Sequence, residues 1–329
     1  MGASDDRMSA EDRLIADYFK PIATHPGALA LTDDAAFVTP APGTDVVLKT
    51  DAIIGGVHFF AEDDARDVAR KALRVNLSDL AAKGATPLGF LVSLALPKDT
   101  TADLLQRFAL GLREDAEAYQ CPLFGGDTDR TPGPVMVSIS MFGSVPSGAM
   151  VRRAGARPGH RVFVTGTIGD AALGLVLRQG ATWPLTAAQR EHLLARYLLP
   201  QPRNALAEVV RAYASAAMDV SDGLAGDLTK LCRVSGVAAH IDVAAVPLSD
   251  AARAAVAADA AMRETALTGG DDFEVLCTVP PARADAFRTA ARAAGVPVTD
   301  IGVVEAGAGA HFMDGGRELA FQRLSFSHF

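Results

Sequence analysis

Apolar and polar residues alternate in the first half of the chain with the periods expected of helices and strands. Ser9 and Asp12 form a capping box ahead of a first helix that ends before Pro21. Helical spacing and apolar runs then predict helices over residues 65–83 and 102–119, and strands over 46–50, 89–96 and 135–145. A short strand is expected to end just before Gly125-Gly126-Asp127.

The second half repeats this alternation. The predicted strands cover 161–165, a short segment ending at 218–219, and 274–279. The predicted helices cover 168–178, 187–197, 203–214, 224–234 and 283–294, and the alanine-rich stretch 244–261 is interpreted as one further helix. Mixed strands and helices in both halves predict the α/β (α+β) class.

A chain of 329 residues is longer than one hydrophobic core usually holds, so two domains are expected. Glycine and proline gather between the halves, at Pro146, Gly148, Gly155, Pro158 and Gly159. Such clusters are typical of domain boundaries. We therefore predict an N-terminal domain over 1–150 and a C-terminal domain over 151–329.

Composition narrows the function classes. Hydrophobic residues make up 49% of the chain and the formal net charge is -8. An acidic chain gains nothing from a phosphate backbone, which argues against nucleic-acid partners. Three separated cysteines, no apolar leader in residues 1–10 and no apolar run long enough to span a bilayer favour a cytoplasmic protein without a membrane partner.

The most conspicuous chemical pattern is a series of aspartates beside small residues. They occur in Asp33-Asp34, Thr50-Asp51, Ser78-Asp79, Gly125-Gly126-Asp127, Asp219-Val220-Ser221-Asp222 and Gly269-Gly270-Asp271-Asp272. Most are expected at strand ends or turns, where α/β folds bind ligands. Converging carboxylates need cations between them, and Mg²⁺ prefers carboxylates together with substrate phosphates. Taken singly, each aspartate is equally explained by turn chemistry or helix capping.

Other polar residues allow two interpretations. His58 follows Gly55-Gly56-Val57 on an expected loop and is either a ligand contact or an ordinary half-buried histidine. Arg152-Arg153 is either a solvated pair or a phosphate clamp. The P-loop, dinucleotide-binding, zinc-protease and α/β-hydrolase fingerprints do not occur in the sequence.

Taken together and in order, these segments resemble the thiamine-monophosphate kinase family. The resemblance covers nearly the whole chain. Its most specific segments are residues 75–85 (VNLSDLAAKGA), 125–128 (GGDT), 219–224 (DVSDGL) and 269–274 (GGDDFE). Each segment alone is a weak signal, whereas all four at this order and spacing form a specific pattern.

The resemblance implies a two-domain fold of the aminoimidazole ribonucleotide synthetase type and a homodimer joined through the N-terminal sheets. It implies ATP and several Mg²⁺ ions in a cleft between the domains. The γ-phosphoryl group of ATP would pass directly to thiamine monophosphate, giving thiamine diphosphate. No protein nucleophile is expected, because the acceptor is already an anionic phosphate.

The resemblance also assigns roles to individual residues. Magnesium would be held by Asp34, Thr50, Asp51, Asp79, Asp127, Asp219 and Asp222. ATP would contact Gly126, Asp127, Arg153 and Ser221. The thiamine substrate would face His58, Asp271 and Phe326.

The sequence departs from the family pattern at Thr32, Lys49 and Asp271, the last being one methylene shorter than the usual glutamate. Two alternatives therefore stay open. One is a related ATP-dependent synthetase with a different acceptor. The other is a non-catalytic protein that binds Mg-nucleotide or thiamine phosphate.

Overall fold

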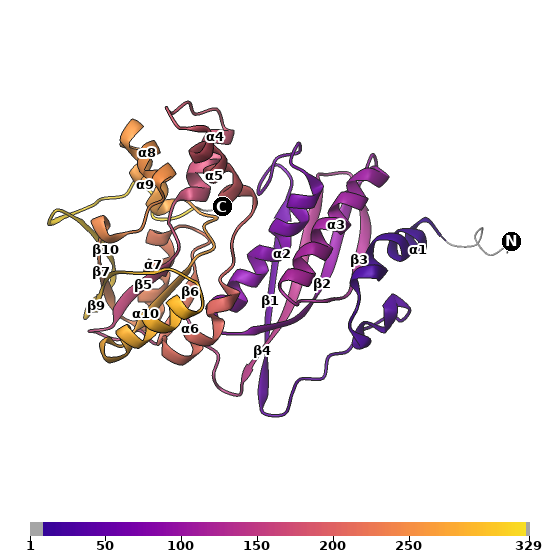
Figure 1. Ribbon diagram of the computed structural model, residues 1–329, viewed down its shortest axis with the longest axis horizontal. Coiled ribbons are helices and arrows are strands. Elements are labelled where there is room, and N and C mark those ends of the chain that lie inside the picture. Colours follow the sequence, from indigo (N-terminus) through magenta and orange to yellow (C-terminus); the bar gives the residue numbers. More distant parts are fainter. Residues whose placement is uncertain (1–8, 327–329) are drawn as a thin grey trace. The chain divides into compact units, whose positions relative to one another are not determined.

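The computed structural model describes residues 9–326, which divide into two compact units. Unit 1 contains the chain up to Leu77 together with Pro87–Ser147, and unit 2 contains Ser78–Thr86 together with the chain from Gly148 onward. Figure 1 shows the elements of each unit. Among the described residues, no helix is long and apolar enough to cross a membrane.

Unit 1 is built on a four-stranded sheet in the order β1-β4-β2-β3. Its strands are β1 (Thr44–Ile54), β2 (Thr86–Pro97), β3 (Leu123–Thr131) and β4 (Met136–Pro146). β1 and β4 are antiparallel, whereas β2 and β3 are parallel and therefore need a crossover connection. That crossover is α3 (Ala102–Ala118), whose N-terminus is capped by the Thr101 side chain.

The helices α2 (Ala65–Ala82) and α3 pack closely against each other. A Cβ on Gly111 would lie 2.1 Å from the carbonyl oxygen of Arg66, so only glycine permits this approach. Arg74 Nε donates to Asp115 Oδ2 over 2.6 Å between the two helices, and both residues are buried. A buried ion pair of this kind fixes the relative position of the helices, because neither charge tolerates losing its partner.

The sheet of unit 1 has one buried face and one open face. On β4, Val137, Ile139 and Met141 are buried, while the alternating Ser138 and Ser140 are partly exposed. This period of two is that of a strand packed on one side only. The open face carries the pocket described below.

The N-terminal segment of unit 1 is irregular. The expected capping box is confirmed, since Asp12 N donates to Ser9 Oγ over 3.0 Å and Ser9 N donates to Asp12 Oδ2 over 3.2 Å. The regular helix α1 (Ala10–Leu14) is short and continues as one π-helical and two 3₁₀ segments, at Ile15–Phe19, Lys20–Ile22 and Pro26–Leu31.

Unit 2 contains a seven-stranded sheet in the order β11-β10-β7-β9-β5-β8-β6. The strands are β5 (Arg161–Thr165), β6 (Ala216–Asp219), β7 (Ala238–Asp242), β8 (Val275–Val279), β9 (Val298–Glu305), β10 (Gly309–Asp314) and β11 (Arg317–Glu318). Its helices are α4 (Asp170–Arg178), α5 (Ala187–Leu198), α6 (Ala207–Tyr213), α7 (Leu224–Ser235), α8 (Asp250–Ala258), α9 (Met262–Thr268) and α10 (Ala284–Ala293).

Alternating strand residues enter two separate cores in unit 2. Val162 and Val164 of β5 pack in a core that also contains Leu228 of α7. Phe163, which lies between them, packs in a second core with Phe287 of α10. Helices therefore cover both faces of this sheet, and the predicted α/β (α+β) class is confirmed.

Three details differ from the sequence predictions. The alanine-rich stretch is not one helix, because Pro247 interrupts it and α8 begins only after the Ser249 cap. Residues 125–127 do not follow a strand but lie inside β3. Asp51 does not end β1, which continues to Ile54.

Candidate functional site

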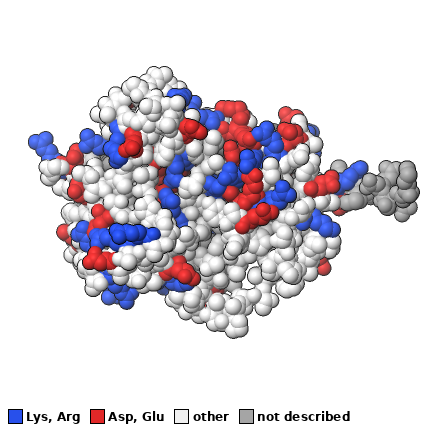
Figure 2. Space-filling view, in the orientation of Figure 1, with Lys and Arg blue, Asp and Glu red and all other residues white. Residues whose placement is uncertain are grey.

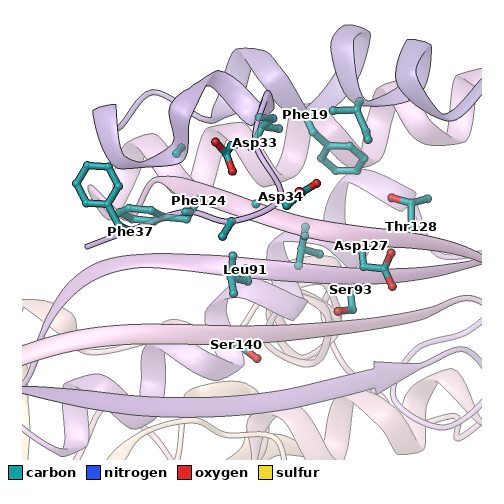
Figure 3. A pocket seen from close by; sticks show the side chains of 18 of the residues that line it. Phe19, Asp33, Asp34, Phe37, Leu91, Ser93, Phe124, Asp127, Thr128 and Ser140 are labelled. Carbon is teal, nitrogen blue, oxygen red and sulfur yellow. The ribbon is translucent and has the colours of Figure 1, made fainter. Parts of the chain in front are cut away.

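A pocket of about 720 Å³ lies on the open face of the unit 1 sheet. Asp34 enters it from the loop before β1, Ser93 from β2, Asp127 from β3 and Ser140 from β4, as Figure 3 shows. The pocket thus brings together three of the residues predicted from the sequence, namely Asp34, Gly126 and Asp127.

Strand register explains why these polar side chains meet. Ser93 lies opposite Asp127 in the β2–β3 pair, and Thr50 lies opposite Ser140 in the β1–β4 pair. The Thr50 and Ser140 hydroxyls are 3.3 Å apart. Because directly paired residues share a face, Thr50 lies on the same face of the sheet as the pocket. Carboxylate and hydroxyl oxygens are hard donors of the kind that Mg²⁺ prefers.

The end of the pocket farther from Asp127 carries aromatic rings. Phe37 and Phe124 line it, and the carboxylates of Asp33 and Asp34 lie between these rings and Asp127 in the view of Figure 3. Ligand sites commonly combine an apolar wall with a few placed polar groups. A ligand that joins a flat ring system to a chain of phosphates has both kinds of surface.

Gly126 is required by packing within the sheet. A Cβ at this position would lie 2.0 Å from the carbonyl oxygen of Val92 on β2. At the adjacent Gly125 the nearest atom to a Cβ would be Leu91 Cδ2, at an ordinary 3.4 Å. The close approach of β2 and β3 therefore explains the glycine at 126, and a contact between its backbone and ATP stays a prediction.

Asp51 and His58 lie in unit 1 but are not among the residues that line this pocket. Asp51 is paired in register with the buried Ile139, on the face opposite to Thr50, and its carboxylate is 3.1 Å from Lys49 Nζ. His58 Nδ1 accepts a hydrogen bond from Ile54 N over 3.1 Å, which leaves Nε2 to carry the proton of the neutral ring. The His58 carbonyl accepts from Lys71 Nζ over 2.9 Å.

Asp79 lies in the last turn of α2, in the segment of that helix that belongs to unit 2. The preceding Ser78 is buried and its hydroxyl donates to the Phe273 carbonyl over 3.3 Å. Ser78 thus attaches this turn to the loop that carries Asp271.

Four of the predicted residues in unit 2 are joined by backbone hydrogen bonds. Asp271 N donates to the Ser221 carbonyl over 2.9 Å, and Phe326 N donates to the Asp222 carbonyl over 3.0 Å. Asp219, at the end of β6, directly precedes this arrangement and is buried. The sequence places these residues far apart, whereas the fold brings Ser221, Asp222, Asp271 and Phe326 to one place.

The Asp222 loop is held by α7. The Ser221 and Asp222 amides donate to Asp227 Oδ2 over 3.0 and 2.9 Å, and Lys230 Nζ contacts both Asp222 Oδ2 and Asp227 Oδ1. Burial raises the pKa of Asp227, although its bonds with Lys230 act in the opposite direction. Asp222 is the more exposed of the two carboxylates.

Arg153 is exposed at the start of unit 2, and its carbonyl lies 3.5 Å from Ser235 Oγ. The adjacent Arg152 carbonyl accepts from Ala217 N on β6 over 2.9 Å. This bond attaches the segment to the strand that leads to Asp219.

The described residues 9–326 contain no cluster of three or more His, Cys, Asp or Glu side chains arranged as a ready-made metal centre. The predicted carboxylates are instead divided between the units, with Asp34, Asp51 and Asp127 in unit 1 and Asp79, Asp219 and Asp222 in unit 2. Mg²⁺ usually completes its shell with waters and substrate phosphates, so few protein ligands suffice. The donor chemistry therefore fits Mg²⁺.

Sequence reasoning assigned no role to a group of fully buried carboxylates in unit 2, formed by Asp170, Asp272 and Glu274, although the last two belong to the 269–274 segment that it singled out. Asp272 directly follows Asp271, and Glu274 lies three residues beyond it. An acidic residue in an apolar strand context is the signal that could have identified them, since such a residue needs a partner.

Comparison with known proteins places the chain in the class of AIR synthase related proteins. Residues 32–145 match the N-terminal domain of AIR synthase related proteins, and residues 157–314 match the C-terminal domain of the same proteins. The structure of a hydrogenase maturation protein HypE in complex with ATP is similar in fold, with a TM-score of 0.78 at 21% identity.

Within that class, the chain belongs to the thiamine-monophosphate kinase family. It is 42% identical to the thiamine-monophosphate kinase of Caulobacter vibrioides over 318 residues, which cover 95% of this chain and 89% of the relative. The crystal structure of the Stenotrophomonas maltophilia enzyme has a TM-score of 0.83 at 37% identity and covers 95% of this chain and 98% of that one. The structure of AaThiL complexed with AMPPCP and TMP has a TM-score of 0.77 at 33% identity, covering 90% and 91%.

Proposed function

We propose that this chain transfers the γ-phosphoryl group of ATP to the phosphate of thiamine monophosphate, giving thiamine diphosphate and ADP. Family membership over nearly the whole chain supports a kinase of this kind. The observation that carries the proposal is the unit 1 pocket, which is lined both by Asp34 and Asp127 and by aromatic side chains. A relative was solved with an ATP analogue and TMP bound.

In the proposed enzyme, Mg²⁺ would be held by Asp34, Thr50, Asp51, Asp79, Asp127, Asp219 and Asp222. When bound, it would supply positive charge that balances the phosphate oxygens. The protein side chains bind and orient these ions and the two substrates, and no protein nucleophile is needed because alignment and charge neutralisation lower the barrier.

Nucleotide contacts are proposed for Gly126, Asp127, Arg153 and Ser221, and thiamine contacts for His58, Asp271 and Phe326. The hydrogen bonds that join Ser221 to Asp271, and Asp222 to Phe326, support a shared role for these segments. His58 is held in place by the hydrogen bond that its Nδ1 accepts from Ile54 N. The exposed guanidinium of Arg153 suits a phosphate, whose oxygens it matches in geometry.

The domain roles follow the same proposal. The N-terminal domain, residues 1–150, binds ATP and magnesium and joins two copies of the chain, while residues 151–329 complete the site. The open face of the unit 1 sheet supports the homodimer, because Leu48 is 70% exposed there on the edge strand β1. Exposed apolar side chains and open sheet edges are common in protein interfaces.

Charge and thiol chemistry support a cytoplasmic protein without nucleic-acid partners. On the face seen in Figure 2, basic and acidic side chains of the described residues are intermixed, and they do not form a single basic area. Cys121, Cys232 and Cys277 are buried free thiols. Burial raises the pKa of Cys121 to about 12, which keeps that thiol protonated and unreactive.

The test is an assay of the purified chain with Mg²⁺, ATP and thiamine monophosphate, with thiamine diphosphate and ADP measured by chromatography. The two products should form in equal amounts. The variant Asp127→Asn should lose at least 100-fold in kcat, in the range reported for loss of a transition-state charge contact.

The matched control is Asp129→Asn. Asp129 lies two residues further along β3, on the same face, but is not among the residues that line the pocket. We expect it to behave as the wild type. Absence of thiamine diphosphate from the wild-type reaction would overturn the proposed function, and ATP use triggered only by another acceptor would favour a related synthetase.

A further inference from the structure

Unit 2 contains two buried carboxylates that the proposed reaction does not use. Asp272 is 1% exposed and Glu274 is 0% exposed, and both lie in the loop that leads into β8. Removing carboxylates from water is costly unless each one is fully bonded. The bonds that hold these two residues therefore indicate what they do.

Glu274 is held by side chains from three other segments. Arg203 donates to it in a fork, from Nε to Oε2 over 2.6 Å and from its terminal nitrogen to Oε1 over 2.5 Å. Arg196 of α5 donates to Oε1 over 2.7 Å, and the Thr165 hydroxyl of β5 donates to Oε2 over 2.6 Å. Paired bonds of this geometry are among the strongest that a carboxylate forms.

Asp272 is fixed to the start of α4. Its Oδ2 accepts from Gly169 N over 2.7 Å, and its Oδ1 lies 3.5 Å from Ala171 N. Gly169 has no capping side chain of its own, so Asp272 acts as the cap of this helix from elsewhere in the sequence. The neighbouring Asp170 is bonded to Thr167, Ser249 and His192 instead.

The loop between Gly269 and Glu274 is not relaxed. Asp271 has φ 71° and Phe273 has φ 51°, a left-handed conformation that L-residues rarely adopt. A Cβ on Gly270 would lie 2.4 Å from the Ser221 carbonyl oxygen, so the loop runs tightly against that segment. Such a conformation persists only where surrounding bonds hold it.

We infer that Glu274 and Asp272 are positioning residues, which hold the 269–273 loop in this conformation and thereby set Asp271 against the thiamine substrate. Asp271 is partly exposed, whereas Asp272 and Glu274, in the same loop, are buried and hydrogen-bonded. Its amide and that of Phe273 donate to the Ser221 and Val220 carbonyls over 2.9 and 2.8 Å, so the loop also sets Ser221. This inference rests on the proposed function, in which Asp271 and Ser221 contact the substrates.

The disrupting variant is Glu274→Gln, since a glutamine amide would place an N–H donor against the guanidinium donors of Arg203 or Arg196. Arg196→Met is a milder second variant, because the fork from Arg203 remains. The matched control is Asp300→Asn. Asp300 of β9 is likewise held by two arginines, with Arg161 Nε at 2.9 Å and Arg288 at 2.7 Å, but it does not contact the loop.

The first measurement is hydrogen exchange at the amides of Asp271 and Phe273 in the full chain. We expect exchange at least 10-fold faster in Glu274→Gln, a smaller increase in Arg196→Met, and no change in Asp300→Asn. Unchanged exchange in both disrupting variants would overturn the inference whatever the enzyme does.

The second measurement is steady-state kinetics. In Glu274→Gln and Arg196→Met, KM for thiamine monophosphate should rise more than KM for ATP. The rise in KM for thiamine monophosphate should be about 10-fold in Glu274→Gln. The control Asp300→Asn should leave both KM values within twofold of the wild type at a comparable loss of melting temperature. Equal effects of Glu274→Gln and Asp300→Asn on both KM values would show that Glu274 has only a structural role. A wild-type chain without thiamine monophosphate kinase activity would refute the proposed function. The exchange measurement would still show whether Glu274 and Asp272 hold the 269–273 loop in its conformation.

Discussion

The substitution Gly126→Ala tests whether the contact between β2 and β3 sets the site in unit 1. The new Cβ would lie 2.0 Å from the Val92 carbonyl oxygen, whereas real Cβ atoms essentially never approach within 3.0 Å. The two strands must therefore separate locally by about 1 Å next to Asp127. Overpacking of this kind costs about 1–3 kcal/mol.

This cost should lower the melting temperature of the chain by roughly 2–12 °C, at about 2–4 °C for each kcal/mol. A displacement of the Asp127 carboxylate by about 1 Å should also reduce kcat/KM for ATP by about 10- to 100-fold. Differential scanning fluorimetry and a coupled ADP assay give the two values.

Gly125→Ala is the control, because its Cβ would meet only Leu91 Cδ2 at 3.4 Å. Both glycines line the same pocket and belong to the same strand. We expect Gly125→Ala to change stability by less than about 0.5 kcal/mol, as is usual for substitutions without a clash. If the two variants have the same melting temperature and the same kcat/KM, the argument from strand contact is wrong.

Three further predictions concern other parts of the chain. Asp79→Asn should reduce turnover far more than it lowers the melting temperature, and equal losses in activity and stability would indicate a structural role instead. Arg74→Met removes one partner of a buried ion pair and should destabilise the chain by about 3 kcal/mol in urea unfolding, against a change near zero for a surface arginine such as Arg253. The hydrogen bond that the His311 Nδ1–H donates to the Glu318 carboxylate raises the pKa of His311 above its usual 6.5, so the associated stabilisation is complete below about pH 6.5 and is lost as the pH rises through the folded pKa. NMR titration should give a pKa above 6.5 for His311 and a lower one after Glu318→Gln, and identical values would contradict this interpretation.

Strong periodicity allowed the long helices to be predicted from the sequence. The predicted helices over 65–83 and 102–119 correspond to α2 and α3 within a residue or so at each end. The strands β7, β9 and β10 were not predicted, because each is short or interrupted by polar residues and glycine. Their membership of the sheet depends on pairing with distant strands, which local periodicity does not reveal.

Part of the candidate site could be predicted and part could not. Asp34 and Asp127 line one pocket, whereas Asp51 lies on the opposite face of the sheet, so the convergence of all the aspartates stays a prediction. The opposite faces of Thr50 and Asp51 follow from the period of two in a strand and could have been read from the sequence. The glycine pair at 125–126 was predicted to follow the end of a strand, but it lies inside β3. Glycine is required at position 126 because of the close contact with Val92 on the neighbouring strand, which the sequence does not reveal.

The buried carboxylates of the 269–274 loop illustrate a further limit. Their bonding partners come from 71 and 78 residues away for Glu274 and from 103 residues away for Asp272. No local pattern indicates such partners, so only the folded chain shows that these acidic residues are satisfied in the core.

The assignment of Ser78–Thr86 to unit 2 has a practical consequence for work with fragments. Lys83 Nζ donates to the Ala217 carbonyl over 2.8 Å, and Ala82 belongs to the same core as Phe163 and Phe287. A gene truncated to begin at codon 148 would encode the larger unit without one of its own pieces. Such a fragment should refold poorly unless a peptide of residues 78–86 is supplied, so complementation by that peptide offers a route to a split protein.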